Sequence, residues 1–221
     1  MTKLHELAEL GQSIWVDYVR RAFARSGELR ALVAQGVRGV TSNPTIFEAA
    51  IARSDDYDPA LQELLPIVSS TRELYEALVL EDIREAADIL RPVYDAGAGA
   101  DGFVSLEVSP QLAHDAAGTV AEARRLFAAL NRPNVMIKVP ATAAGISAVE
   151  ALIAAGVNVN VTLIFSLDHY RAVALAYIAG LERLLAEGGN PAPVASVASF
   201  FLSRIDTAVD RILADLATGS G

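Results

Sequence analysis

Lys138 stands in an unusual place for a charged residue. The chain has only two lysines, Lys3 and Lys138, and Lys138 lies inside the apolar run Val135–Val139. Burial disfavours the ammonium ion and depresses the pKa of a lysine. A neutral amine in a pocket is the nucleophile that forms a Schiff base with a carbonyl substrate. Spacing alone leaves two interpretations open: a Schiff-base lysine, or a lysine at a strand end whose ammonium reaches solvent.

Other polar residues interrupt or follow the remaining apolar runs. They are Asp17, Asn43, Glu107, Asn160, Thr162 and Ser199. Asn160 and Thr162 alternate with valine and leucine, so both point to one face of a strand. In a parallel α/β fold the carboxyl ends of the strands converge on one site. Together these residues predict a site that holds one amine, two carboxylates, amides and hydroxyls, a set that can transfer protons and bind substrate hydroxyls.

Each of these residues also has a structural interpretation. Asp17 and Glu107 could form ion pairs with arginines, and Asn43 could cap the turn that follows it. Asn160 and Thr162 could be core polar groups with satisfied hydrogen bonds. Jointly the residues favour a site, because independent polar interruptions need not fall at the same relative point of six strands.

Arg204 is the candidate for binding an anion. It follows the segment Phe200–Ser203, and a guanidinium at that point can hold a phosphate. The alternative is a surface arginine that pairs with Asp206 or with the preceding turn. The glycines of Gly36–Gly39 do not form a dinucleotide-binding or P-loop motif.

Composition excludes several classes of protein. The formal net charge is −9, and no strongly basic segment offsets it, so a nucleic-acid partner is not expected. The absence of cysteine excludes a disulfide framework, a thiolate zinc site and a cysteine nucleophile. The three histidines show no metal-binding spacing.

The first 11 residues are too polar for a signal peptide, and no run of 18 apolar residues predicts a membrane span. We therefore expect a cytoplasmic protein with no membrane partner.

The elements that must position these residues alternate along the chain. Six apolar or β-branched runs predict strands at Ile14–Tyr18, Val37–Thr41, Gly102–Val108, Val135–Val139, Asn158–Ile164 and Val194–Ala198. Helical stretches separate them, which predicts an α/β fold. No domain boundary is evident, so we expect a single domain over 1–221.

Two helices stand out in the sequence. Residues 71–96 predict the first, with a capping box formed by Ser70 and Glu73 and with a break or kink near Pro92. It lies in a long crossover between the second and third strands, residues 42–101. A second helix is expected over 203–216. A (β/α)₈ barrel needs two further units, so the pattern alone leaves an open sheet or part of a longer barrel.

Five motifs resemble the transaldolase family. Val40–Phe47 resembles its first signature, and Val135–Ile146 resembles the second, which surrounds the Schiff-base lysine. Shorter matches follow in the family's order at Ser105–Val108, Asn160–Ser166 and Ser199–Arg204. The resemblance covers nearly the whole chain and raises the Schiff-base interpretation of Lys138 above the alternative.

The resemblance implies a (β/α)₈ TIM barrel that needs no metal or organic cofactor. It implies transfer of a dihydroxyacetone unit from sedoheptulose 7-phosphate or fructose 6-phosphate to an aldose phosphate, in the pentose phosphate pathway. Lys138 would attack the ketose carbonyl, and Asp17 would take the C4 hydroxyl proton. Glu107 would act with Thr162 through a water.

The resemblance also implies the substrate contacts. Asn43 and Asn160 would hold substrate hydroxyls, Ser199 would orient the C1 hydroxyl, and Arg204 would contribute to the phosphate site. Phe201 would also belong to the substrate-binding residues, and it resembles the transferase side of the family, because the aldolase branch tends to carry tyrosine at that position.

Two features bear on the place of the chain within the family: the number of strands and the spacing between Pro44 and Lys138. Only six strands are countable, whereas the family places phosphate-binding groups, including an arginine, after its seventh strand. We therefore expect a barrel truncated after the sixth βα unit, whose open edges call for a homo-oligomer or a complementing C-terminal segment. Lys138 lies 94 positions after Pro44, as in the larger, long-crossover transaldolases that are sometimes fused to phosphoglucose isomerase. Two alternatives stay open: an inactive fragment that needs a partner segment, and a fructose 6-phosphate aldolase.

Overall fold

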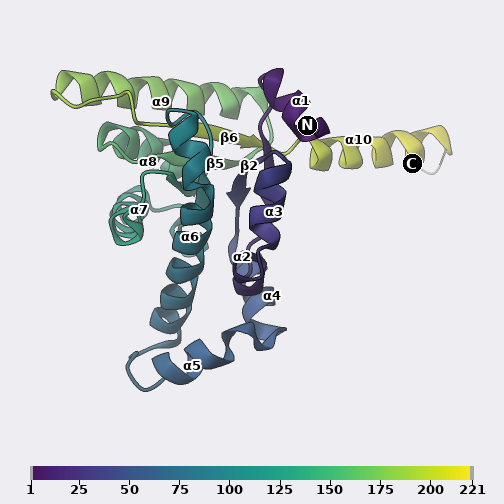
Figure 1. Cartoon of the computed structure of the whole chain (residues 1–221). Coiled ribbons are helices and arrows are strands. Elements are labelled where there is room, and N and C mark those ends of the chain that lie inside the picture. The colour runs from purple at the N-terminus through teal and green to yellow at the C-terminus, as the bar shows by residue number, and fades with distance from the viewer. Residues whose placement is uncertain (1, 220–221) are drawn as a thin grey trace. The chain divides into compact units, whose positions relative to one another are not determined.

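Strands and helices alternate along the chain in a computed structural model that describes residues 2–219 (Figure 1). The strands are β1 (Ile14–Asp17), β2 (Val37–Thr41), β3 (Val104–Glu107), β4 (Val135–Pro140), β5 (Val159–Ile164) and β6 (Ser196–Phe200). They follow one another in chain order, and the pairs β1–β2, β2–β3 and β5–β6 are parallel. Sequential parallel strands, each followed by a helix, confirm the predicted α/β fold of (β/α)₈ type, with six βα units among the described residues.

Ten α-helices and two 3-10 turns complete the described residues. The α-helices are α1 (Lys3–Glu9), α2 (Arg21–Arg25), α3 (Glu28–Gln35), α4 (Pro44–Ala52), α5 (Asp58–Leu64), α6 (Thr71–Ala96), α7 (Ala116–Leu130), α8 (Ala143–Ala154), α9 (Leu167–Ala186) and α10 (Leu202–Ala217). The 3-10 turns are η1 (Asp55–Tyr57) and η2 (Pro110–Leu112). None of the helices within residues 2–219 is long and apolar enough to cross a membrane.

Contacts group the chain into two units. Unit 1 contains the residues up to Val108 together with Glu122–Ile137, and unit 2 contains Ser109–Ala121 together with the residues from Lys138 onward. Unit 1 therefore carries β1, β2, β3 and the first half of β4. Unit 2 carries the second half of β4 with β5 and β6.

In unit 1 the long helix α6 supplies much of the buried surface. Its apolar positions Leu78, Ile83 and Leu90 are each at most 1% exposed. A buried ionic group joins α2 to α6, because Arg21 Nε donates to Asp82 Oδ1 at 2.8 Å. The predicted start of α6 is confirmed, since Ser70 Oγ accepts from the N–H of Glu73 at 3.2 Å.

Two details of α6 differ from the prediction. The carboxylate of Glu73 accepts from the backbone N–H of Ser69, not from that of Ser70, so the capping box is only half formed. The break expected at Pro92 is absent, because the helix continues to Ala96. A proline removes one backbone hydrogen bond, and a 26-residue helix with a buried face tolerates that loss.

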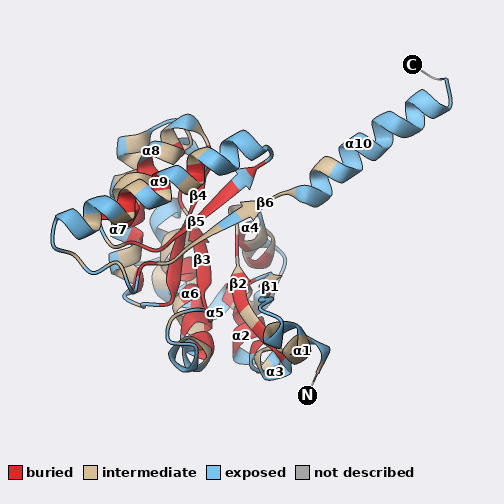
Figure 2. Ribbon diagram, turned by 90° about the horizontal axis from the view of Figure 1, so that it is seen from above, coloured by how far each residue is buried: buried red, intermediate tan, exposed pale blue. Residues whose placement is uncertain are grey.

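In unit 2 the strands β4 and β5 form the buried centre, and α8 and α9 lie side by side (Figure 2). Every residue of β4 is buried, as is every residue of β5 except Leu163. The last helix, α10, has no buried residue and projects away from β6 (Figure 2). Its exposed apolar residues include Val209, Ile212 and Leu216.

The sixth strand begins later than the apolar run predicts. Val194 is buried, but its N–H donates to the carbonyl of Pro191 in a turn at 3.0 Å, so it is lost to the strand ladder. The strand instead covers Ser196–Phe200. Ser199 consequently lies inside β6 and not after it, which corrects the prediction from the sequence.

Candidate active site

Two candidate carboxylates in unit 1 point to the same face of the sheet. Asp17 is the last residue of β1 and is level with Thr41 of β2, which in turn is level with Ser105 of β3. Residues that are level in parallel strands share a face, and so do residues two apart on one strand. Glu107 follows Ser105 by two positions and ends β3, so its side chain shares the face of Asp17. Asp17 is exposed and Glu107 is half-buried.

Asn43 connects this edge of the sheet to a helix. Its Oδ1 accepts from the N–H of Ile46 at 3.0 Å, which makes Asn43 the N-cap of α4. The capping interpretation of Asn43 is therefore confirmed. The cap occupies Oδ1, and within residues 2–219 no hydrogen bond of its Nδ2 group is found. The Nδ2 donors of Asn43 suit a substrate hydroxyl.

Lys138 lies in unit 2, in the middle of β4, and is 6% exposed. The N–H of Ala141, just after β4, donates to the carbonyl of Thr162 at 2.8 Å. This hydrogen bond joins the carboxyl ends of β4 and β5, so Lys138 lies on the strand next to Asn160 and Thr162. Asn160 and Thr162 are two positions apart on β5 and are each 1% exposed.

Asn160 and Ser199 are joined directly. Ser199 Oγ donates to Asn160 Oδ1 at 2.8 Å, which links β5 to β6. The strand register agrees, because Asn160 is level with Val197 and Ser199 lies two positions further along the same face. Asn160, Thr162 and Ser199 thus form a group of one amide and two hydroxyls in unit 2, and the amine of Lys138 lies on the neighbouring strand β4.

An aromatic pair lies beside this group at the start of α10. Phe165 stacks on Phe201, with ring centroids 5.4 Å apart and planes at 24°. The guanidinium carbon of Arg204 lies 4.5 Å from the centroid of the Phe201 ring, which is a cation–π contact. Arg204 is exposed and, among the described residues, has no ion pair, so the expected alternative of pairing with Asp206 is wrong. Its charge remains available to an anion.

One aromatic residue beside this group and one backbone feature were not predicted from the sequence. Phe165 belongs to a quoted motif but was not singled out, because its partner Phe201 is distant in sequence. Leu163 has a φ of 61° in the left-handed region, and the β5–β6 register shifts between Val161 and Ile164. A leucine in that conformation is strained, and no pattern in the sequence predicts this backbone conformation. Within residues 2–219 no group of three or more His, Asp or Glu side chains is arranged to hold a metal ion.

Comparison with known proteins identifies the family. The family model described as transaldolase/fructose-6-phosphate aldolase matches residues 14–219. The chain is 53% identical over 218 residues to "Transaldolase 2" of Nostoc sp. (strain PCC 7120), covering 98% of this chain and 57% of that protein. It is 51% identical over 216 residues to "Transaldolase" of Thermobifida fusca (strain YX), covering 97% of this chain and 59% of the relative.

A third relative gives the same picture. "Transaldolase 1" of Streptomyces coelicolor is 50% identical over 216 residues, which cover 97% of this chain and 57% of the relative. The chain thus spans less than three fifths of the length of each of these three relatives. The match nevertheless runs from β1 to beyond α10 and includes every candidate residue named above. The chain belongs to the transaldolase/fructose-6-phosphate aldolase family.

Proposed function

We propose that the chain carries the Schiff-base chemistry of a transaldolase, with Lys138 as the nucleophile. The observation that carries the proposal is the placement of Lys138, an amine that is 6% exposed within a wholly buried strand. Membership of the family and the hydrogen-bonded Asn160 and Ser199 nearby support it. The substrates would be sugar phosphates, with sedoheptulose 7-phosphate or fructose 6-phosphate as donor and an aldose phosphate as acceptor.

The proposed first half of the reaction cleaves the donor. Lys138 Nζ attacks the C2 carbonyl carbon, and the carbinolamine loses water to give a protonated imine. Asp17 then accepts the proton of the C4 hydroxyl as the C3–C4 bond breaks. The aldose phosphate leaves, and the electron pair of the broken bond moves into the imine, which becomes an enamine.

The second half rebuilds a ketose on the acceptor. The enamine carbon attacks the aldehyde carbon of the acceptor, and Asp17 returns the proton to the new hydroxyl. Water then hydrolyses the imine and releases Lys138. We assign the proton transfers of imine formation and hydrolysis to Glu107 with Thr162, acting through a water.

The remaining candidate residues bind. We propose that Asn43 and Asn160 hold substrate hydroxyls, that Ser199 orients the C1 hydroxyl, and that Arg204 contacts the phosphate beside Phe201. The cation–π contact supports the last assignment, because it holds the guanidinium in place without neutralising it. The pentose phosphate pathway, a cytoplasmic location and a single barrel domain over 1–221 belong to the same proposal and rest on the family resemblance.

Product analysis tests the reaction type. Fructose 6-phosphate is incubated with the chain, with and without an aldose phosphate acceptor, and the products are separated. A transaldolase forms a new ketose phosphate only when the acceptor is present, whereas a fructose 6-phosphate aldolase releases free dihydroxyacetone without it. The family model covers both activities, and Phe201 favours the transferase. Lys138→Arg is the inactive control, and Lys3→Arg is the matched control that keeps activity.

The alternative of an inactive fragment is tested on the same samples. Circular dichroism and light scattering establish folding and mass. A folded chain that gives neither product contradicts the proposal for the chain alone. A homodimer that is active, or activity restored by adding a polypeptide from the C-terminal part of a relative, would identify the proposed oligomer or complementing segment.

A further inference from the structure

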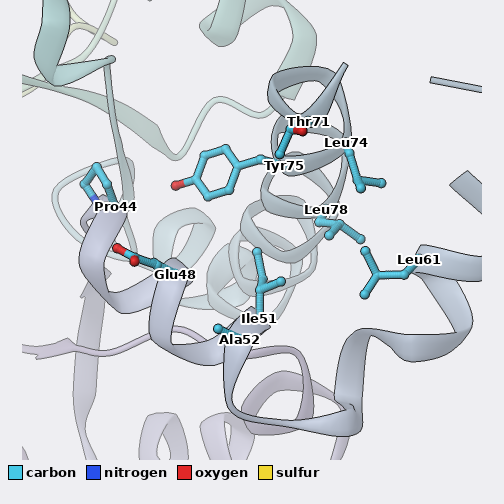
Figure 3. A pocket seen from close by; sticks show the side chains of 9 residues that line it. All are labelled: Pro44, Glu48, Ile51, Ala52, Leu61, Thr71, Leu74, Tyr75 and Leu78. Atoms are coloured by element: carbon cyan, nitrogen blue, oxygen red, sulfur yellow. The ribbon is translucent and has the colours of Figure 1, made fainter. Parts of the chain in front are cut away.

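A cavity lies in unit 1, among α4, α5 and α6. Its volume is about 380 Å³, which falls in the range of small-molecule sites. Its walls are almost wholly apolar and are formed by Ile51, Ala52, Leu61, Leu74 and Leu78 (Figure 3). None of the candidate catalytic or substrate-binding residues lines it. The lining therefore differs from the set of candidate residues, and Glu107 lies close enough to Tyr75 to affect its pKa.

The cavity is held open by the packing beneath it. Ile51 and Leu61 pack against a buried cluster that contains Tyr57 and Leu78, which are 0% and 1% exposed. Helices that rest on a fixed core do not collapse into a neighbouring void without breaking those contacts. Binding of an apolar group to walls of this kind is favourable, because it removes apolar surface from water.

The polar end of the cavity is formed by Tyr75 and Glu48. The phenol oxygen of Tyr75 and the carboxylate of Glu48 both point toward the end where Pro44 lies (Figure 3). The Tyr75 ring is fixed edge-on against Phe47, with centroids 6.4 Å apart and planes at 88°. Within residues 2–219 the phenol oxygen has no hydrogen-bond partner, so one oxygen at the polar end is available to a ligand.

The electrostatic environment of this end is negative. Burial, together with the carboxylates of Glu107 and Glu48, raises the pKa of Tyr75 to about 12, so the phenol stays neutral. No cationic side chain lines the cavity among the described residues. A neutral phenol beside carboxylates can accept a hydrogen bond from a cation, and the carboxylate of Glu48 can pair with it.

We propose that this cavity binds a small primary ammonium compound with an apolar body. The ammonium group lies between Glu48 and Tyr75, and the hydrocarbon part lies among Leu61, Leu74 and Leu78. An anion is disfavoured by the carboxylates, and a neutral alcohol lacks the ion pair. The site goes beyond the proposed transaldolase reaction and does not depend on it.

Three probes with matched hydrocarbon chains test the proposal: hexylamine, hexan-1-ol and hexanoate. Each is titrated into the full chain, and the methyl resonances of Ile51, Leu61 and Leu74 are followed by NMR. We expect saturable shifts with hexylamine and an affinity about two- to fivefold higher than for hexan-1-ol, the effect of one partly exposed ion pair. Hexanoate should bind most weakly. No saturable shift with hexylamine, or equal affinity for all three probes, overturns the proposal.

Two variants with matched controls locate the site. Glu48→Gln should lower the affinity for hexylamine to that for hexan-1-ol, while Glu63→Gln, on an exposed neighbouring position, should leave the preference unchanged. Ala52→Trp should abolish binding of all three probes, because Ala52 is exposed at the cavity wall and the new ring occupies the cavity. Ala186→Trp is the control on α9. Undiminished hexylamine binding in Ala52→Trp, or a retained amine preference in Glu48→Gln, contradicts the assignment.

Discussion

Ser199 Oγ donates to Asn160 Oδ1 at 2.8 Å, so β5 and β6 are joined by side chains as well as by the backbone ladder. Asn160 is 1% exposed and Ser199 is half-buried. A hydrogen bond in such surroundings holds the amide in one orientation, because any other orientation leaves a buried polar atom without this donor. The amide that we propose to bind the substrate is thereby held in place before the substrate arrives.

Removing this hydrogen bond should cost stability. Ser199→Ala is expected to lower the free energy of unfolding by about 1–3 kcal/mol, since Asn160 Oδ1 loses a donor in a buried position. Urea denaturation measures the change. In a double-mutant cycle with Asn160→Ala the two effects should not add. Ser203→Ala, at an exposed position on α10, is the control, and an equal effect there would contradict the interpretation.

Arg204 should contribute to the binding of an anion. Arg204→Gln is expected to weaken the binding of inorganic phosphate about tenfold, the loss of one charge-assisted hydrogen bond. Isothermal titration calorimetry measures the dissociation constant. Arg211→Gln, on the same exposed helix, should leave it unchanged. Equal affinity in the Arg204 and Arg211 variants would remove Arg204 from the proposed phosphate site.

A side chain at position 145 should destabilise the protein. A Cβ at this position would lie 1.9 Å from the carbonyl oxygen of Pro140, at the end of the strand that carries Lys138. Gly145→Ala is expected to lower the free energy of unfolding by about 1–3 kcal/mol, because α8 or the end of β4 must move. Ala143→Ser, at an exposed position of the same helix, is the control. If the Gly145→Ala variant is as stable as the control, α8 and the end of β4 can move without loss of stability, which would contradict the prediction.

Loss of the buried ion pair between Arg21 and Asp82 should lower the free energy of unfolding far more than loss of the exposed ion pairs of Arg25. Arg21 and Asp82 are 3% and 1% exposed, and Arg21→Met leaves a buried carboxylate without its cation. We expect a loss of about 3–5 kcal/mol, part of which Asp82→Leu should restore in the double variant. Arg25→Met, which breaks only exposed pairs, should cost at most about 1 kcal/mol.

The deficit of Arg21→Met should also depend on pH. Burial is the main cause that raises the pKa of Asp82, and Arg21 opposes it, so removing Arg21 raises this pKa further. A carboxyl whose pKa is higher in the folded than in the unfolded state stabilises the protein at low pH and loses that contribution as pH rises. The deficit should therefore shrink on acidification. A deficit that grows on acidification would contradict this account of Asp82.

The sequence predicted the four central strands well because β2, β3, β4 and β5 are mostly buried, β4 along its whole length. Such strands appear as continuous apolar runs, and polar residues among them, such as Lys138 and Asn160, stand out. The position of Ser199 was wrong because apolar character alone does not show that Val194 bonds within a turn. The stacking of Phe165 on Phe201 and the polar end of the cavity in unit 1 depend on side chains that are distant in sequence and meet only in the folded protein. No local pattern encodes either of them.

Borohydride trapping tests the central claim most directly. The chain is incubated with fructose 6-phosphate, reduced with borohydride, and mapped by peptide mass spectrometry. We predict a dihydroxyacetone-sized adduct on Lys138 and none on Lys3, the other lysine of the sequence. Lys138→Arg should abolish it. A folded chain with no adduct on Lys138, or with equal labelling of Lys3, would contradict the assignment of Lys138 as the Schiff-base nucleophile.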